Sequence, residues 1–257
     1  MEREHPDVHQ RLVGPVSTDR IALDAFDELT SSGVAAETRS GPFVVGFESE
    51  RESRSFLHEI EQVEKAGQSV PLHRLDDPQD TEPHLSDGVS TAFTMEGQRF
   101  LDPGAFVRSL AEAVRARGAR IVTGGEVRTL QHGPEGIAVN TFVHEPLRAD
   151  VVVLATGAWL PRLARPLGVR TQVQSGRGYS FSVRTEQPAR FPIYFPARRV
   201  ACTPYRGRLR IAGTMEFRDA NHPLEPKRIE AICNGIREAG VTIQWGCEGR
   251  VDSVAQH

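Results

Sequence analysis

The chain has 257 residues, of which 39% are hydrophobic and 25% are charged, proportions that are ordinary for a globular protein. Its formal net charge of −3 gives no electrostatic argument for binding nucleic acid or an anionic membrane surface. No apolar stretch approaches the roughly 20 residues that span a bilayer, and the polar first residues, MEREHPDVHQRLVG, do not resemble a secretory signal.

The cysteines are odd in number and contain no C-x-x-C pair; they are Cys202, Cys233 and Cys247. This usage favours reduced thiols over a disulfide or a metal site, and therefore a cytoplasmic protein. His5 and His9 stand four residues apart, but Pro6 lies between them in a terminal segment, and the other histidines show no metal-ligand spacing. We therefore expect no metal.

The first third of the chain predicts two helices and one strand. Apolar residues recur at helical spacing over 19–31 and 51–66. Between them, GPFVVGF at 41–47 favours a strand. Residues 72–88 are polar and contain prolines, so we expect a loop with one helical turn at most, whose Asp and Glu residues form a solvated face.

The middle of the chain begins with the clearest helix signals in the sequence. Asp102 is a predicted N-cap, Pro103 occupies the first helical position, and Gly118 follows the last turn. Residues 119–132 then predict a strand, a Gly-Gly turn and a second strand, and residues 136–142 predict a further strand.

The string ADVVVLATGAW at 149–159 contains a short apolar run, residues 151–154, that is rich in β-branched side chains. Such a run predicts a strand buried on both faces, as in a parallel sheet. The small residues after it would lie at the carboxyl end of the strand, where open α/β sheets bind ligands. Taken alone, the string fits a dinucleotide pocket and ordinary packing equally well.

From residue 169 the pattern becomes strands separated by turns, and a last helix is predicted at about 226–239, ended by Gly240. Mixed helices and strands followed by a late antiparallel run predict two interleaved domains, one α/β and one α+β. The expected fold is thus a partial α/β domain interleaved with an antiparallel-sheet domain.

The glycine-rich dinucleotide motif G-x-G-x-x-G, placed between a strand and a helix, is absent. SGRGYSF at 175–181 supplies the first two glycines, but Phe181 stands at the third position and the flanking residues are strand-like. We interpret this string as a false match. The sequence also lacks a P-loop, a G-x-S-x-G elbow and an H-E-x-x-H helix.

Four strings, read in order, are more specific: GQRFLDPGAFVRSLAEAVRARGARIVTGGEVRTL, ADVVVLATGAWLPRLARPLGV, GRGYSFSV and TPYRGRLRIAGTMEF. Together they resemble the D-amino-acid dehydrogenase branch of the flavin-dependent amine and amino-acid oxidoreductases (the DAO family), which include glycine oxidase and sarcosine oxidase. The resemblance extends from about residue 10 to about residue 235. It implies FAD as the cofactor and hydride transfer to flavin from a D-amino acid or related amine, giving an imine and then a 2-oxo acid.

The resemblance implies cofactor contacts from two segments. Val127 matches a valine whose backbone meets the adenine of FAD. Ala155, Thr156 and Gly157 match the second strand end that contacts the flavin in the family. Trp159 would pack beside this strand end. The alternatives are a core strand residue for Val127 and a buried structural aromatic for Trp159.

Substrate contacts are implied for Arg177 and Tyr179, which match the start of a substrate-domain strand that approaches the flavin. The Tyr179 hydroxyl could orient a substrate, and the alternative is an ordinary half-buried strand tyrosine. We interpret Arg210, Gly213 and Glu216 as sheet scaffold and ion-pairing residues rather than chemical groups.

Members of the family begin with a glycine-rich βαβ unit that holds the FAD pyrophosphate, and they end with a segment carrying an arginine suited to the substrate carboxylate. Neither is found in this sequence, so we expect a truncated chain whose catalysis alone is impaired. The alternatives are a non-catalytic remnant and a subunit whose partner chain completes the FAD site. The expected organisation is a substrate domain at 1–97 and 167–245, a partial FAD-binding domain at 98–166, and a divergent tail at 246–257.

The sequence identifies neither the amino acid or amine nor the electron acceptor. If the electron acceptor lies in the membrane, the protein would have to associate peripherally with the inner face of that membrane. No sequence feature indicates such an association.

Overall fold

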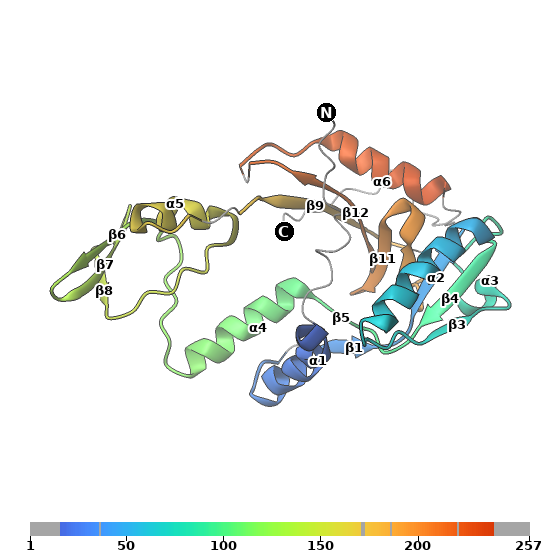
Figure 1. The fold of residues 1–257 in the computed structure, drawn as a ribbon, viewed down its shortest axis with the longest axis horizontal. Helices are drawn as coiled ribbons and strands as arrows, with labels where there is room; N and C mark the ends of the chain where they lie inside the picture. Colours follow the sequence, from blue (N-terminus) through green and yellow to red (C-terminus); the bar gives the residue numbers. More distant parts are fainter. Residues whose placement is uncertain (1–15, 36, 171–172, 186, 220, 239–257) are drawn as a thin grey trace.

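The computed structural model describes residues 16–35, 37–170, 173–185, 187–219 and 221–238. Helices and strands alternate irregularly along these residues, so the mixed class expected from the sequence is confirmed (Figure 1). The helices of more than one turn are α1 (Val16–Ser31), α2 (Glu50–Lys65), α4 (Pro103–Ala116) and α6 (Pro226–Glu238), and the shorter ones are α3 (Pro78–Thr81) and α5 (Leu160–Ala164). Short 3-10 turns occur at Gly157–Trp159, Arg165–Leu167 and Pro196–Arg198.

A seven-stranded sheet dominates the described residues and draws its strands from two separate parts of the chain. From the first part come β2 (Phe43–Phe47), β3 (Leu72–Arg74) and β4 (Thr91–Met95), and from the second β9 (Gly176–Val183), β10 (Ile193–Phe195), β11 (Val200–Tyr205) and β12 (Arg208–Phe217). The strand order is β3-β4-β2-β10-β11-β12-β9. The two parts join where β2 and β10 pair in parallel, and the other pairs in this sheet are antiparallel.

Two smaller sheets lie apart from the large one. The strands β6 (Val127–Gly133), β7 (Gly136–Thr141) and β8 (Leu147–Ala149) form a three-stranded antiparallel sheet. Figure 1 places this sheet at the opposite end of the molecule from β3 and β4. The strands β1 (Thr38–Ser40) and β5 (Arg99–Leu101) form an antiparallel pair, near which α1 and α4 pack through Phe26 and Phe106, whose ring centroids are 5.2 Å apart.

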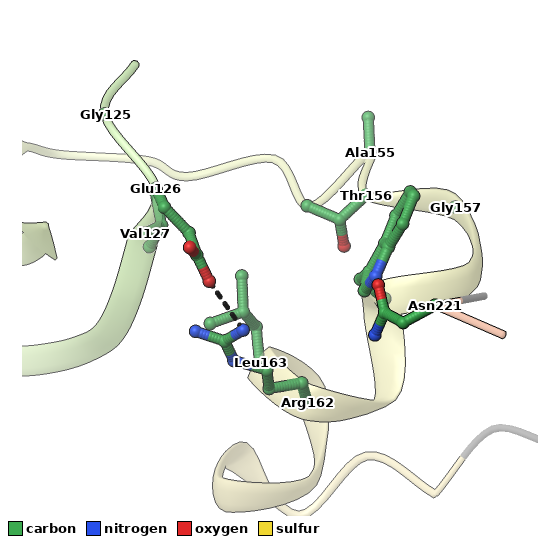
Figure 2. A pocket seen from close by; sticks show the side chains of 10 residues that line it. Gly125, Glu126, Val127, Ala155, Thr156, Gly157, Arg162, Leu163 and Asn221 are labelled. Atoms are coloured by element: carbon green, nitrogen blue, oxygen red, sulfur yellow. Dashed lines mark hydrogen bonds and ion pairs between the residues drawn. The ribbon is translucent and has the colours of Figure 1, made fainter. Parts of the chain in front are cut away.

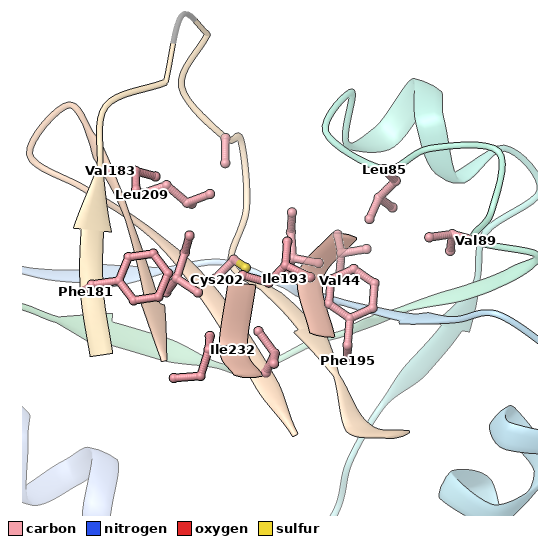
Figure 3. Packing of buried hydrophobic residues seen from close by; sticks show 14 of the residues in the cluster. Val44, Leu85, Val89, Phe181, Val183, Ile193, Phe195, Cys202, Leu209 and Ile232 are labelled. Carbon is pink, nitrogen blue, oxygen red and sulfur yellow. The ribbon is translucent and has the colours of Figure 1, made fainter. Parts of the chain in front are cut away.

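The hydrophobic core covers both faces of the large sheet, because successive side chains of a strand point to opposite faces. In β2, Val44 belongs to one buried cluster and Val45 to the other. The smaller cluster packs β2 and β4 against α2, where the rings of Phe47 and Phe56 are 5.4 Å apart. The larger cluster packs the sheet against α6 through Ile232, which is 1% exposed (Figure 3).

Local sequence signals explain where the two best-defined helices begin and end. Before α2, the Ser49 hydroxyl accepts a hydrogen bond from the Glu52 backbone N–H at 3.4 Å, while the Glu52 carboxylate accepts one from the Glu48 N–H at 3.1 Å. This exchange resembles a capping box. At α4, Asp102 is the N-cap residue and Pro103 the first helical residue, as predicted, but the Asp102 side chain makes no cap hydrogen bond. It lies instead 3.1 Å from the Arg206 guanidinium.

The segment 72–88 corrects two expectations. It contributes strand β3 as well as the expected helical turn α3, because residues 72–74 pair with β4. It is not a uniformly solvated acidic face either, since Glu82 is 0% exposed. The carboxylate of Glu82 is buried because backbone and imidazole N–H groups surround it.

The strand predicted at 151–154, buried on both faces, is not formed. Its residues have no regular secondary structure and pair with no described strand, and Val151 and Val153 are 77% and 83% exposed. The first strand predicted within 119–132 is also missing, since β6 begins only at Val127. The physical reason is the same in both places: among the described residues, no neighbouring strand supplies a ladder of hydrogen bonds.

Cys202 is buried and Cys233 half-buried, and both are free thiols. Cys247, Gly240 and the divergent tail at 246–257 lie outside the described residues. A search of the described residues for a helix long and apolar enough to cross a membrane finds none.

Candidate functional site

A cavity of about 860 Å³ lies between the start of β6 and the segment around α5 (Figure 2). This volume is within the range of about 300–1,000 Å³ that is usual for small-molecule and cofactor sites. The cavity is lined by all five residues for which cofactor contact is predicted: Val127, Ala155, Thr156, Gly157 and Trp159.

Trp159 is 54% exposed, so the alternative of a buried structural aromatic is wrong for the described chain. Val127 is half-buried at the first position of β6, where it pairs with Thr141. Val127 is therefore part of the small sheet and also part of the cavity wall. Both placements keep the two residues accessible from the cavity.

The backbone after residue 154 turns sharply into a 3-10 helix. Gly157 has φ +52°, in the left-handed region that favours glycine, and a Cβ built on it would meet nothing within 4 Å. The Thr156 Oγ1 is buried without a hydrogen-bond partner among the described residues. Figure 2 shows this hydroxyl pointing into the space between Glu126 and Asn221.

These features fit a dinucleotide. Open backbone at Gly157 lets a ligand approach closely, and the unpartnered hydroxyl of Thr156 can bond to a ligand at no cost to an existing hydrogen bond. Val127 and Leu163 supply apolar wall. An apolar lining with a few polar groups is typical of small-molecule and cofactor sites.

The other half of the lining is not predictable from the sequence: Gly125, Glu126, Arg162, Leu163 and Asn221. Arg162 Nη1 lies 2.7 Å from Glu126 Oε1, which joins α5 to the residue before β6 (Figure 2). Both side chains are about half exposed, so this ion pair adds little stability. Asn221 comes from the connection after β12, which brings the part of the chain that forms the large sheet to the cavity.

Arg177 and Tyr179, the predicted substrate residues, do not line the cavity. Both are buried in β9, at 6% and 1% exposure. The Tyr179 hydroxyl donates to Glu216 Oε1 at 2.6 Å, and Arg177 Nη1 lies 3.6 Å from the same oxygen. Tyr179 is thus not a half-buried strand tyrosine, and substrate contact by either residue stays a prediction.

Glu216 is the buried carboxylate at the centre of this network, in agreement with its predicted ion-pairing role. Its Oε2 lies 3.3 Å from Arg218 Nε and 3.8 Å from Arg228 Nη2. The hydrogen bond from Tyr179, followed by the charges of the surrounding arginines, lowers the pKa of Glu216 in spite of the opposing effect of its burial. The group is therefore held as a carboxylate.

Two further features of the sequence have plain outcomes. Gly176 and Gly178 lie inside β9 and precede no helix, so the interpretation of SGRGYSF as a false dinucleotide match is confirmed. Among the described residues, no group of three or more His, Cys, Asp or Glu side chains could hold a metal ion.

The sequence model of the family described as FAD dependent oxidoreductase matches residues 16–239. The chain belongs to this family of FAD dependent oxidoreductases. The resemblance drawn from the four strings is thereby confirmed, and the cofactor of the family is FAD, as the resemblance implies.

Curated relatives in the family carry the same name as the branch inferred from the sequence. A D-amino acid dehydrogenase of Rhizorhabdus wittichii is 27% identical over 205 residues, which cover 77% of this chain and 49% of the relative. A D-amino acid dehydrogenase of Dechloromonas aromatica is 31% identical over 145 residues, covering 53% of this chain and 35% of the relative. The chain thus spans about half the length of the first of these relatives.

Solved structures share the fold. Glycine oxidase from Geobacillus kaustophilus superposes with a TM-score of 0.74 at 19% identity, covering 90% of this chain and 64% of that protein. Glycine oxidase from Bacillus cereus gives a TM-score of 0.73 at 22% identity with the same coverage of both chains. The fold of an FAD-dependent oxidase is therefore retained over most of this chain.

Proposed function

We propose that this chain is part of an FAD-dependent oxidoreductase that oxidises the C–N bond of a D-amino acid or a related amine. The observation that carries the proposal is the meeting of Val127, Thr156 and Gly157 around one cavity of cofactor size. When bound, FAD supplies the two-electron acceptor for this oxidation. The carbon bearing the amine loses a hydride and the nitrogen a proton, and water converts the resulting imine to a 2-oxo acid and ammonia.

Each of these residues would hold the cofactor in a different way. The lack of a side chain at Gly157 leaves room for close approach to the backbone. Thr156 would use its free hydroxyl for a hydrogen bond, and Val127 would contribute apolar contact. Trp159 would pack beside the bound ring system, since it is exposed on the cavity wall.

The choice of a D-amino acid rests on the relatives, two of which are named D-amino acid dehydrogenase. An amine of another kind stays open for this chain. We propose no electron acceptor, because none of the described residues points to one.

We also infer that catalysis requires a further polypeptide segment, supplied by a partner chain, that completes the FAD site. Residues 151–154 form no strand with the described residues, and their exposure alternates from one side chain to the next, with Val151 and Val153 the more exposed. A segment whose backbone N–H and C=O groups are unpaired can pair with an added strand. Alone, the chain would then be a poor catalyst.

The proposed domain division follows the sheets. Residues 1–97 and 167–245 would form the substrate domain, because strands from both ranges build the seven-stranded sheet. Residues 98–166 would form part of the FAD-binding domain, which carries most of the cavity wall. The pair of β1 and β5 would join the two domains at their boundary.

The test is a titration of the purified chain with FAD, followed by flavin fluorescence and by the visible spectrum after removal of free FAD. We expect Thr156→Val to weaken FAD binding about tenfold, the effect of one lost hydrogen bond. Its melting temperature should not fall, since this hydroxyl has no partner among the described residues. Thr91→Val, the same change in β4 outside the cavity, should bind FAD like the wild type.

A retained flavin band that D-amino acids bleach in the absence of oxygen would support the oxidoreductase assignment. A folded chain that takes up no FAD, either alone or after addition of a partner bearing the glycine-rich unit, would favour the non-catalytic remnant instead.

A further inference from the structure

Asn221, in the connection after β12, lies on the cavity wall, and side chains of β9 contact Pro223 and Glu225 just beyond it. Glu216 lies directly opposite Arg177 in the register of the two strands. Both side chains are buried, and the Tyr179 hydroxyl completes the group by its 2.6 Å hydrogen bond to Glu216. Three polar side chains from two paired strands thus form one rigid cluster beneath the connection.

This cluster holds the backbone of residues 221–225 directly. The Tyr179 hydroxyl accepts a hydrogen bond from the Glu225 N–H at 3.1 Å. Arg177 Nη1 donates to the Pro223 carbonyl at 3.1 Å. The Tyr179 hydroxyl hydrogen-bonds to Glu216 and the Arg177 guanidinium forms an ion pair with it, and both also hydrogen-bond to the backbone of the connection.

Arg218 closes the connection from its other side. Its guanidinium bridges two carboxylates, with Nε 3.3 Å from Glu216 and Nη1 2.8 Å from Glu225. The same Nη1 donates to His222 Nε2 at 3.2 Å, and His222 Nδ1 donates to the Pro223 carbonyl at 2.9 Å. Arg218, at the start of the connection, thereby links Glu225, at its end, to the buried carboxylate of Glu216.

Asn221 is the residue that this arrangement presents to the cavity. It lines the wall together with Gly157, and Figure 2 shows its side chain beside that turn, across from Glu126. Its backbone N–H is fixed by the Asp219 carboxylate at 2.9 Å. The side-chain carboxamide has no hydrogen-bond partner among the described residues, so its donor and acceptor are available to a ligand.

We infer that Arg177, Tyr179 and Glu216 are positioning residues that place Asn221 on the cavity wall, where its carboxamide hydrogen-bonds to the bound dinucleotide. The inference rests on the proposed function, since it takes the ligand of the cavity to be FAD. It assigns Arg177 and Tyr179 a role other than substrate contact. It also explains why Arg177 and Tyr179, which the resemblance implies as substrate ligands, are buried and bonded to the connection.

The first test measures anchoring without any cofactor, by amide hydrogen exchange of the peptide that covers residues 221–225. Tyr179→Phe removes the acceptor of the Glu225 N–H, so exchange in this peptide should be at least about tenfold faster. Tyr205→Phe is the matched control in β11, because no hydrogen bond joins the Tyr205 hydroxyl to residues 221–225, and it should leave the peptide unchanged. Unchanged exchange in Tyr179→Phe would overturn the anchoring.

The second test measures FAD affinity in a double-mutant cycle. Asn221→Ala alters an exposed residue and should weaken FAD binding about tenfold without loss of folding. Tyr179→Phe should weaken binding in the wild-type background but have no further effect in the Asn221→Ala background, because it acts through Asn221. Independent, additive losses would overturn the positioning role.

The two tests separate this inference from the proposed function. A wild-type chain that takes up no FAD, either alone or with a partner bearing the glycine-rich unit, would overturn the proposed function and the carboxamide contact together. The exchange experiment would still decide the anchoring. A wild-type chain that binds FAD as tightly as Asn221→Ala does would overturn only the inference.

Discussion

Glu82 and His84 form a buried pair in which Glu82 Oε1 lies 2.7 Å from His84 Nδ1. The other carboxylate oxygen accepts the backbone N–H groups of Arg190 and Phe191 at 2.7 and 3.1 Å. His84 Nε2 lies 3.0 Å from the Gln187 carbonyl oxygen. The pair therefore ties the segment before β4 to the segment before β10, two parts of the chain that are far apart in sequence.

Glu82→Gln should destabilise the protein by about 2–4 kcal/mol, because the new amide N–H₂ would face an N–H donor inside a buried site. Denaturant unfolding followed by circular dichroism measures this loss. Glu61→Gln, the same change on the exposed face of α2, should alter the free energy of unfolding by less than about 0.5 kcal/mol. Equal effects of the two substitutions would contradict the structural role of Glu82.

The lowered pKa of Glu216 predicts a pH dependence of stability with a definite sign. A carboxylate whose pKa is lower in the folded than in the unfolded state stabilises the fold above its unfolded pKa of about 4.3. The stabilisation is lost as the pH falls through the lowered folded value. The difference in unfolding free energy between wild type and Glu216→Gln should thus be constant between about pH 6 and 8 and shrink below about pH 4.

Urea unfolding of both proteins across this range measures the difference, and Glu64→Gln on α2 is a control with an exposed carboxylate. A difference that is independent of pH down to about pH 3 would show that Tyr179 and the arginines do not hold the charged form.

Elements with strong local signals could be predicted from the sequence. The helix at 51–66 was recognisable from its apolar spacing, and α4 from Pro103 and Gly118 at its two ends. The burial of Glu82 could not be predicted, because the partners of its second carboxylate oxygen, the N–H groups of Arg190 and Phe191, are more than one hundred positions away. A polar segment with prolines, such as 72–88, is typical of a solvated loop. Glu82 is buried instead because it contacts Arg190 and Phe191 from a distant part of the chain.

The strand predicted at 151–154 illustrates a different limit. The apolar run is real, but a strand exists only with a neighbour, and the described residues provide none. The five predicted cofactor residues do meet in one cavity, although only Val127 belongs to a strand and the strand predicted before the other four is not formed. Asn221 and Arg162 could not be foreseen, because their places in the wall depend on how the connection after β12 and helix α5 fold back.

The two described cysteines should differ in reactivity because they differ in burial. Burial raises the pKa of the Cys202 thiol to about 12, and it raises that of Cys233 against the opposing charge of Arg237. At pH 8 the thiolate fraction of Cys202 is then roughly one in ten thousand. Iodoacetamide should leave Cys202 unmodified in the folded protein, modify Cys233 slowly, and modify both in urea.

Peptide mapping by mass spectrometry reports each cysteine separately. Modification of Cys202 at the same rate with and without urea would contradict its burial in the large hydrophobic cluster.

The last prediction compares a buried valine, Val44, with two exposed valines of the unpaired segment 151–154, Val151 and Val153. Val44→Ala in β2 should lower the free energy of unfolding by about 2 kcal/mol, since Val44 is 0% exposed. Val151→Ala and Val153→Ala should each change it by less than about 0.5 kcal/mol in the isolated chain, because their side chains lie in solvent. Denaturant unfolding of the three variants measures all of these values.

The same valines should matter once a strand is added beside them. Burial of Val151 and Val153 by a partner polypeptide would make the affinity for that partner fall in both variants, while Val44→Ala changes stability without a specific loss of binding. If Val151→Ala instead destabilised the isolated chain as strongly as Val44→Ala, the segment would already be packed in the free protein. The inferred site for an added strand would then be occupied, and the requirement for a partner would lose its structural basis.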